Sequence, residues 1–133
     1  PVIDWDKAKV VTEIAPTAEE IASMKFAVRI CEQVKSNAIV MVQGLATVGI
    51  GPGQTSRVEA VKIAARRAGD RGQGCILASD AFFPFKDGIE QAAAAGAASI
   101  VQPGGSIRDQ EVIDEANARG MSMLFTSQRL FRH

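Results

Sequence analysis

Polar residues in this sequence gather in three loops, each of which follows a short apolar run. The loops are residues 79–87, 102–109 and 126–133, and the runs before them end at Ala78, Val101 and Phe125. In open α/β sheets, ligands bind beyond the carboxyl ends of the strands. Three such loops at one edge of a sheet would form one site, so the sequence predicts a protein that binds a small molecule.

The first of these loops is unusually aromatic. Phe82, Phe83 and Phe85 lie within four residues, in a chain with six Phe and no Tyr. Aromatic faces beside a carboxylate, here Asp87, suit a flat heterocycle that carries N–H donors. A loop that only fills the core, with Asp87 as the N-cap of the next helix, fits the same residues. Both interpretations stay open at this point.

A glycine-rich turn precedes a predicted helix at residues 49–57. Backbone N–H groups at a helix start attract anions, and Arg57 could bind a phosphate or carboxylate through a forked pair of hydrogen bonds. The glycine spacing fits neither the dinucleotide fingerprint nor the Walker A loop. A tight turn followed by a solvated Arg is an equally good interpretation.

Other polar residues have weaker signals. Asn37 could end a helix, or its amide could bind the polar edge of a ligand. The segment Ser106–Asp109 favours a plain helix start, with Asp109 well placed for the helix dipole. Arg129 and Arg132 are compatible with a phosphate site or with simple solvation.

Alternating strands and helices must position these loops. We expect helices over residues 18–35, 55–69, 87–95 and 107–119, a hairpin of 38–42 with 45–50, and strands at about 75–78, 98–101 and 121–125. Capping boxes at Thr17–Glu20 and Ser56–Glu59 mark the first two helix starts, and Gly96 and Gly120 end the last two helices. Residues 1–16 look irregular, with a short β-prone stretch at 10–12. The pattern predicts a single α/β domain, 1–133, with a mixed sheet of about five strands.

Bulk composition narrows the function classes. The chain has 15 basic and 15 acidic residues, which gives no electrostatic reason to expect nucleic acid or a membrane surface as partner. Its apolar runs are far shorter than the roughly 18 residues that span a bilayer, and we see no secretory signal. Cys31 and Cys75 lie in apolar patterns, typical of buried free thiols in a cytoplasmic protein. With His133 as its single His and no Cys-x-x-Cys, the chain has no zinc motif.

Five motifs together resemble a known family, the bifunctional purine-biosynthesis enzymes with AICAR transformylase and IMP cyclohydrolase activities. They are residues 34–40, 48–57, 78–88, 102–109 and 129–133, in the family's order and with compatible spacing. The similarity runs from about residue 10 to the end and matches the C-terminal part of the family. Lys35, in the first motif, counts among the predicted substrate-binding residues.

This resemblance implies a fold and a reaction. The transformylase fold is similar to cytidine deaminase without its zinc, here as a single three-layer domain. The family transfers a formyl group from formyl-tetrahydrofolate to the amine of aminoimidazole-carboxamide ribonucleotide (AICAR). The expected ligands are therefore a nucleotide and a folate co-substrate, with no metal.

Roles for individual residues follow from the same resemblance. Asn37 and Arg57 match positions that contact the nucleotide or the reacting centre, and Asn37 is the candidate catalytic residue. Phe82 and Asp87 match positions that line the base and folate pocket. Arg129 matches a residue that holds the nucleotide phosphate.

Departures from the family leave two hypotheses. The family's Lys-His pair and its cyclohydrolase domain have no counterpart in this sequence, and Lys86 and Pro52 replace the usual Arg and Ala. The chain is either half of a formyltransferase site completed by another chain, or a stand-alone non-catalytic module that binds a nucleotide or folate. In both cases we expect it to form a homodimer or to bind a partner chain, through the Ala-rich stretch 92–95 and the loop 82–85.

Overall fold

Ten strands and α-helices make up the computed structural model, which describes residues 3–128. In chain order they are β1 Lys9–Val10, α1 Ala18–Cys31, β2 Ile39–Gln43, β3 Ala46–Gly51, α2 Arg57–Ala68, β4 Ile76–Ser79, α3 Asp87–Ala94, β5 Ser99–Gln102, α4 Asp109–Ala118 and β6 Ser122–Phe125. Short 3-10 helices cover Trp5–Lys7 and Gly69–Gly72. The predicted order of helices and strands is confirmed.

All the strands form one mixed sheet, in the order β1-β6-β5-β4-β2-β3. Strands β4, β5 and β6 are parallel, whereas β2 is antiparallel to both of its neighbours. The sheet has six strands rather than the expected five, because β1 pairs with β6 through Lys9 and Phe125. Two residues are too few to show a strand period, so the β-prone composition of residues 10–12 was the only signal near β1.

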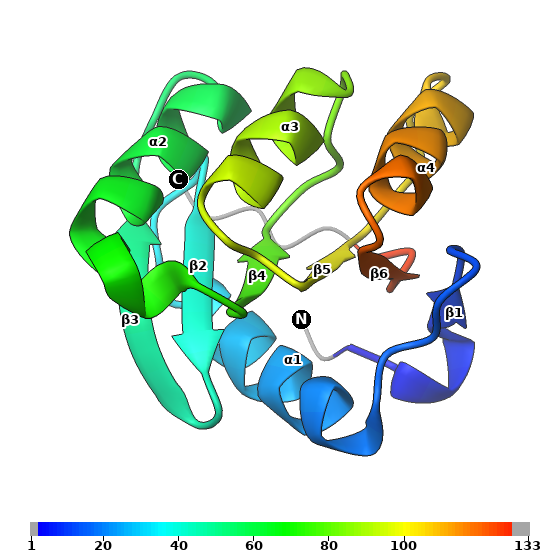
Figure 1. Cartoon of the computed structure of the whole chain (residues 1–133), viewed down its shortest axis with the longest axis horizontal. Helices are drawn as coiled ribbons and strands as arrows, with labels where there is room; N and C mark the ends of the chain where they lie inside the picture. The colour runs from blue at the N-terminus through cyan, green and yellow to red at the C-terminus, as the bar shows by residue number, and fades with distance from the viewer. Residues whose placement is uncertain (1–2, 129–133) are drawn as a thin grey trace.

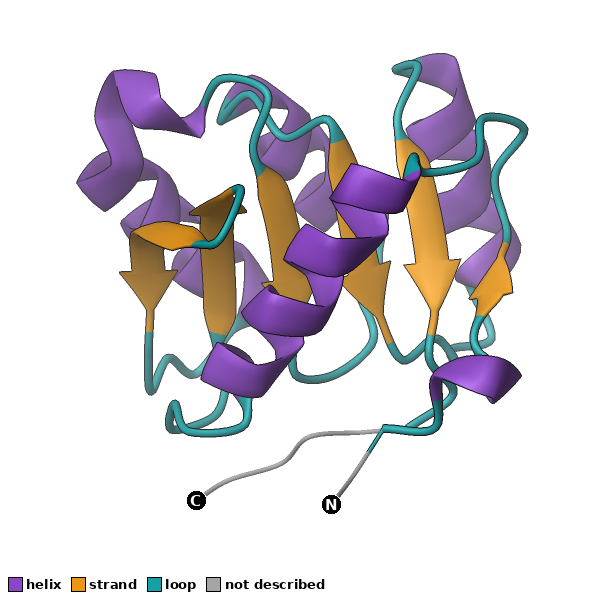
Figure 2. Ribbon diagram, turned by 90° about the horizontal axis from the view of Figure 1, so that it is seen from below, coloured by secondary structure: helices purple, strands orange, loops and turns teal. Residues whose placement is uncertain are grey.

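Helices cover both faces of the sheet, which makes three layers. Helix α1 crosses one face, and α2, α3 and α4 lie side by side on the other (Figure 1). Seen from the α1 side, this helix runs diagonally over the central strands (Figure 2). The predicted three-layer α/β domain with a mixed sheet is therefore observed.

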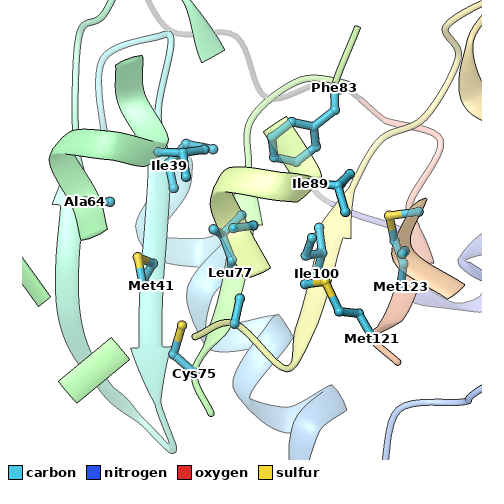
Figure 3. Close-up of a cluster of buried hydrophobic side chains, with 14 of the residues drawn as sticks. Ile39, Met41, Ala64, Cys75, Leu77, Phe83, Ile89, Ile100, Met121 and Met123 are labelled. Carbon is cyan, nitrogen blue, oxygen red and sulfur yellow. The ribbon is translucent and has the colours of Figure 1, made fainter. Parts of the chain in front are cut away.

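Two hydrophobic cores lie on either side of the sheet. Successive residues of β2 alternate between them: Ile39 and Met41 face α2, while Val40 and Val42 face α1. Figure 3 shows the first core, in which Phe83 from the aromatic loop lies near Ile89 of α3. Because the central strands are buried on both faces, their sequences are continuous apolar runs rather than alternating apolar and polar residues.

Alanines 92–95 belong largely to this first core. Ala92 is fully buried, and Ala93 and Ala95 pack against the same cluster. The small side chains let α3 lie close to its neighbours. Only Ala94 of this stretch is exposed, so the stretch offers little apolar surface for the expected partner contact.

Helix boundaries differ from the prediction in two places. Helix α1 ends at Cys31 rather than near residue 35, so Asn37 lies in a loop and does not end the helix. Helix α3 begins at Asp87, with Lys86 at the N-cap position, so Asp87 does not cap it. The Thr17 capping box is present with both of its hydrogen bonds.

Candidate functional site

Four strands end at the same edge of the sheet. Strands β4, β5 and β6 are parallel, and β3 runs in their direction because both β3 and β4 are antiparallel to β2. The reversed β2 begins at this edge, which brings Asn37 there. The prediction that the three loops share one edge is confirmed as far as Gln128; Arg129, Arg132 and His133 lie outside the described residues.

A cavity of about 320 Å³ opens at this edge. Its walls are Asn37, Thr55, Ser56, Arg57, Ala81, Phe82 and Pro84. Three of the predicted site residues, Asn37, Arg57 and Phe82, therefore meet around one space. The volume is at the small end of the range for ligand pockets.

Arg57 is the central charged group of this cavity. It is the first residue of α2, whose N-cap Ser56 accepts a hydrogen bond from the Glu59 N–H, and it is only 8% exposed. Its Nη1 donates to Asp80 Oδ1, and its Nη2 donates to Asn37 Oδ1 at 3.0 Å. The interpretation of Arg57 as a solvated side chain is wrong, because the guanidinium is buried and paired.

Asp80 is the residue that the sequence analysis missed. It follows β4 directly and is fully buried, and its N–H donates to Ala38 O at 3.3 Å. An Asp so close to the apolar run 75–78 is an unusual choice, because a buried carboxylate needs a partner. That was the available signal, but nothing in the sequence linked it to Arg57.

The ion pair leaves two polar atoms unused. Arg57 Nε and Asp80 Oδ2 are buried and have no hydrogen-bond partner among the described residues. Most buried polar atoms in folded proteins are paired. Two unpaired atoms on one ion pair, beside a cavity, make this location the candidate functional site.

Backbone pairing holds Asn37 in place. Its N–H donates to Gln54 O at 3.1 Å, and Gln54 N–H donates back to Asn37 O at 3.3 Å. The Gly53 N–H donates to Lys35 O at 2.7 Å. The Lys35 side chain is exposed and does not line the cavity, so the observed contribution of Lys35 is its carbonyl.

Each Phe of the aromatic loop has a different environment. Phe83 is fully buried, and its N–H donates to the buried Gln102 Oε1 at 3.1 Å. Phe82 lines the cavity, and Phe85 is 49% exposed with the Arg108 guanidinium 5.1 Å from its ring centre. Phe83 thus fills the core, as one interpretation predicted, whereas the binding of a flat heterocycle at Phe82 stays a prediction. Asp87 is exposed and does not line the cavity.

Asp109 has the structural role that its position favoured. Its carboxylate accepts hydrogen bonds from the Gly105 N–H at 2.8 Å and the Ser106 N–H at 3.0 Å. These bonds fasten the loop after β5 to the start of α4. Asp109 is thus occupied in fixing the loop rather than in facing the cavity.

Both cysteines are buried free thiols, as predicted. Burial, together with the nearby charge of Asp80, raises the pKa of Cys31, and burial raises the pKa of Cys75 to about 12. Both thiols are therefore protonated at neutral pH, and neither is a ready nucleophile. Within residues 3–128 no three His, Cys, Asp or Glu side chains gather in a way that could hold a metal.

Each helix within residues 3–128 is too short or too polar to cross a bilayer. The cytoplasmic location stays a prediction.

Comparison with known proteins gives the following matches. The family model described as "AICARFT/IMPCHase bienzyme" matches residues 2–67. The bifunctional purine biosynthesis protein PurH of Acetivibrio thermocellus is 53% identical over 99% of this chain and 26% of its own length. The PurH protein of Parvibaculum lavamentivorans is 52% identical over 98% of this chain and 26% of its own length. The chain thus spans about a quarter of these relatives, and its C-terminal placement stays a prediction.

Solved structures with the same arrangement of elements include RibD of Acinetobacter baumannii. Form 1 has a TM-score of 0.55 at 15% identity and covers 79% of this chain and 33% of RibD. Form 2 has a TM-score of 0.54 at 14% identity and covers 80% of this chain and 34% of RibD. At such low identity the likeness concerns the fold alone, and it supports the α/β architecture.

Proposed function

We propose that this chain belongs to the AICARFT/IMPCHase bienzyme family, whose model matches residues 2–67, and that its cavity is part of an AICAR transformylase site. The observation that carries the proposal is the meeting of Asn37, Arg57 and Phe82 around one 320 Å³ space. We also propose that the fold is of the cytidine deaminase type, a finer assignment than the α/β architecture described above.

The chemistry of the ligand fits these side chains. AICAR carries a flat heterocycle, for which the Phe82 ring offers a stacking face. Its carboxamide oxygen is an acceptor for the Asn37 amide, and Arg57 brings a buried positive charge to the wall. We assign the nucleotide phosphate to Arg129, and we keep Lys35 and Asp87 as predicted substrate contacts made through their exposed side chains.

The reaction requires a proton to move. The AICAR amine attacks the formyl carbon, a C–N bond forms, and the bond to the folate nitrogen breaks with its electron pair. The proton lost by the amine must reach that departing nitrogen. Donors fixed at the cavity wall, above all Asn37, would stabilise the oxygen on which negative charge accumulates.

Among the described residues, the cavity lining supplies no evident group for this proton transfer. It contains amide, hydroxyl, guanidinium and apolar side chains, and no His, Asp, Glu, Cys or Lys. We therefore propose that the acid–base residue comes from outside the 133 residues, in another part of a longer protein or in another chain. The same observation favours the second candidate function, a non-catalytic module that binds a nucleotide or folate.

Calorimetry tests the shared part of both candidates. We expect the chain to bind AICAR and Phe82→Ala to weaken that binding about tenfold, because stacking of a base on an aromatic ring contributes roughly 1–3 kcal/mol. Phe85→Ala is the matched control, since this ring lies outside the cavity. Equal losses in the two variants would contradict the proposed site.

A formyl-transfer assay separates the candidates. We expect transfer from formyl-tetrahydrofolate to AICAR only when the chain is joined to, or mixed with, the remaining part of a PurH relative. Binding without transfer in that mixture would support the non-catalytic module instead.

A further inference from the structure

We propose that Asp80 is a positioning residue, which acts through Arg57 to set the orientation of the Asn37 amide. This inference rests on the proposed function of the cavity and deepens it. Asp80 does not line the cavity and is fully buried. The Asp80 carboxylate contacts the cavity wall through Arg57, which does line the cavity.

A rigid guanidinium connects the two ends of this network. Its Nη1 donates to Asp80 Oδ1 and its Nη2 donates to Asn37 Oδ1, so one planar group bonds to both side chains. Because the five donors of a guanidinium have fixed relative directions, anchoring one nitrogen determines where the other points. The carboxylate of Asp80 thus sets the position from which Nη2 reaches Asn37.

The direction of the Asn37 amide follows from the chemistry of its partner. A guanidinium has donors and no acceptor, so the amide must turn its oxygen toward Arg57. No described residue accepts a hydrogen bond from Asn37 Nδ2. The amide therefore offers its two N–H donors to a ligand, and it selects an acceptor such as a carboxamide or formyl oxygen.

Loss of the Asp80 charge would free this arrangement. Without its carboxylate anchor the guanidinium has one fixed contact fewer, and the amide can rotate to present its oxygen to the cavity. An oxygen facing a ligand carbonyl repels it, so binding falls although no ligand contact has been removed. The unpaired Asp80 Oδ2 and Arg57 Nε show that this pair is held by a single nitrogen–oxygen contact, which makes it sensitive to such a change.

The first test needs no ligand. Asp80→Asn keeps the size of the side chain and removes its charge. The matched control is Asp114→Asn, because Asp114 is exposed and accepts a hydrogen bond only from Gln110. In nuclear magnetic resonance spectra of the 133-residue chain, the side-chain NH₂ signals of Asn37 are assigned by their loss in Asn37→Asp. We expect these signals to shift and broaden in Asp80→Asn and to stay unchanged in Asp114→Asn.

The second test is a double-mutant cycle measured by calorimetry with AICAR. When Asn37 is present, we expect Asp80→Asn to weaken AICAR binding about tenfold. In the Asn37→Ala background we expect the same substitution to weaken binding less than about twofold, because the effects of two coupled residues on the binding free energy are not additive. A purely structural role for Asp80 would give the same loss in both backgrounds.

The outcomes separate this proposal from the proposed function. Asn37 signals that superimpose on those of the unmodified chain, or additive losses in the cycle, would overturn the role of Asp80. If the unmodified chain does not bind AICAR, the proposed function fails and the spectra alone decide the role of Asp80. If Asp80→Asn does not fold, Asp80→Glu keeps the charge and moves the carboxylate by one methylene, and we expect the same change in the Asn37 signals.

Discussion

At the scale of single residues, Arg57 and Asp80 form the most buried ion pair among the described residues. Both side chains are out of water, at 7% and 0% exposure. Desolvation of two charges is costly, and their attraction repays that cost only while both are present. The other ion pairs within residues 3–128 lie at the surface, where such contacts contribute little.

Removing one partner of the buried pair should therefore be far more costly than removing both. We expect Arg57→Met to lower the free energy of unfolding by about 3–5 kcal/mol, because it leaves the Asp80 carboxylate buried and unpaired. Arg57→Met combined with Asp80→Leu should recover most of that loss. Urea unfolding followed by circular dichroism measures both variants.

The surface pair of Arg119 with Glu115, at 2.6 Å, provides the matched control. Arg119→Met should change the free energy of unfolding by about 0.5 kcal/mol or less. A similar cost for Arg57→Met and Arg119→Met would show that the buried pair is not the sensitive point we infer.

The two buried thiols predict how stability depends on alkaline pH. Their pKa values are raised in the folded chain, so the unfolded chain loses these protons first, near a pKa of 9.0. Stability is then complete below about pH 9 and falls as pH rises, by about 1.4 kcal/mol per pH unit for each thiol. Urea unfolding between pH 8 and pH 10.5 measures this slope.

Cys75→Ala should flatten that slope, because one of the two titrating thiols is absent. Its loss of buried volume lowers stability equally at every pH, so the slope and not the absolute value is compared. An unchanged slope in Cys75→Ala would contradict the raised pKa of this thiol.

Residue types and the family resemblance together predicted three of the residues that line the cavity. Asn37, Arg57 and Phe82 line the cavity, whereas the side chains of Lys35 and Asp87 point to solvent. The sequence could show which groups bind anions or stack on rings. It could not show the partner of Arg57, because Asp80 is 23 positions away and only the fold brings the two together.

At the scale of elements, helix α2 lies unusually close to strand β3. A Cβ atom on Gly49 would come within 2.2 Å of Ala64 O, and one on Gly51 within 2.0 Å of Ala60 O. Both glycines therefore permit backbone contact between a strand and the helix that covers it. This contact fixes the height of α2 above the sheet, and with it the position of Arg57 at the helix start.

A methyl group at Gly51 should push the helix away. We expect Gly51→Ala to lower the free energy of unfolding by about 3 kcal/mol, because the atom it meets is backbone and cannot rotate aside. Gly44→Ala is the control: nothing lies within 4 Å of its Cβ position, and only the φ of +58° opposes the change. Its expected cost is about 1 kcal/mol, and thermal unfolding compares the two.

The pattern of glycines was visible in the sequence but had two meanings. Gly49 and Gly51 alternate with Val48 and Ile50, which places both glycines on one face of β3. We interpreted them as part of an anion-binding turn, although that period of two also indicates close packing of another element.

The hairpin and the helix centres were predictable because their signals are local. The end of α1 was not, because residues 35–37 pair with residues 53–54 farther along the chain.

At the scale of the whole molecule, the domain offers an open edge rather than a closed active site. Its cavity brings Asn37, Arg57 and Phe82 together, and the chain covers about a quarter of the relatives it matches. Loss of an acid–base group costs roughly 10²–10⁴ in rate. We therefore expect formyl transfer by this chain alone to be slower than transfer by a full-length relative by at least that factor, in a direct assay under the same conditions.

The self-association that we predicted also belongs to this scale. With Ala92 buried and Ala93 and Ala95 packed against the core, the aromatic loop is the stronger candidate surface, and its Phe85 is 49% exposed. We expect sedimentation at high micromolar concentration to show dimers, and Phe85→Ser to weaken them. A clean monomer in both samples would contradict this prediction.

The reversal of β2 ties ligand binding to folding. Because this strand runs against its neighbours, Asn37 at its start meets Arg57 from α2 and Phe82 after β4 only when the sheet is assembled. A molecule that contacts all three has nothing comparable to hold in the unfolded chain. Such a ligand therefore binds only the folded domain, and its binding free energy adds to the free energy of unfolding. At a concentration of one hundred times Kd, it would stabilise the domain by about 2.7 kcal/mol.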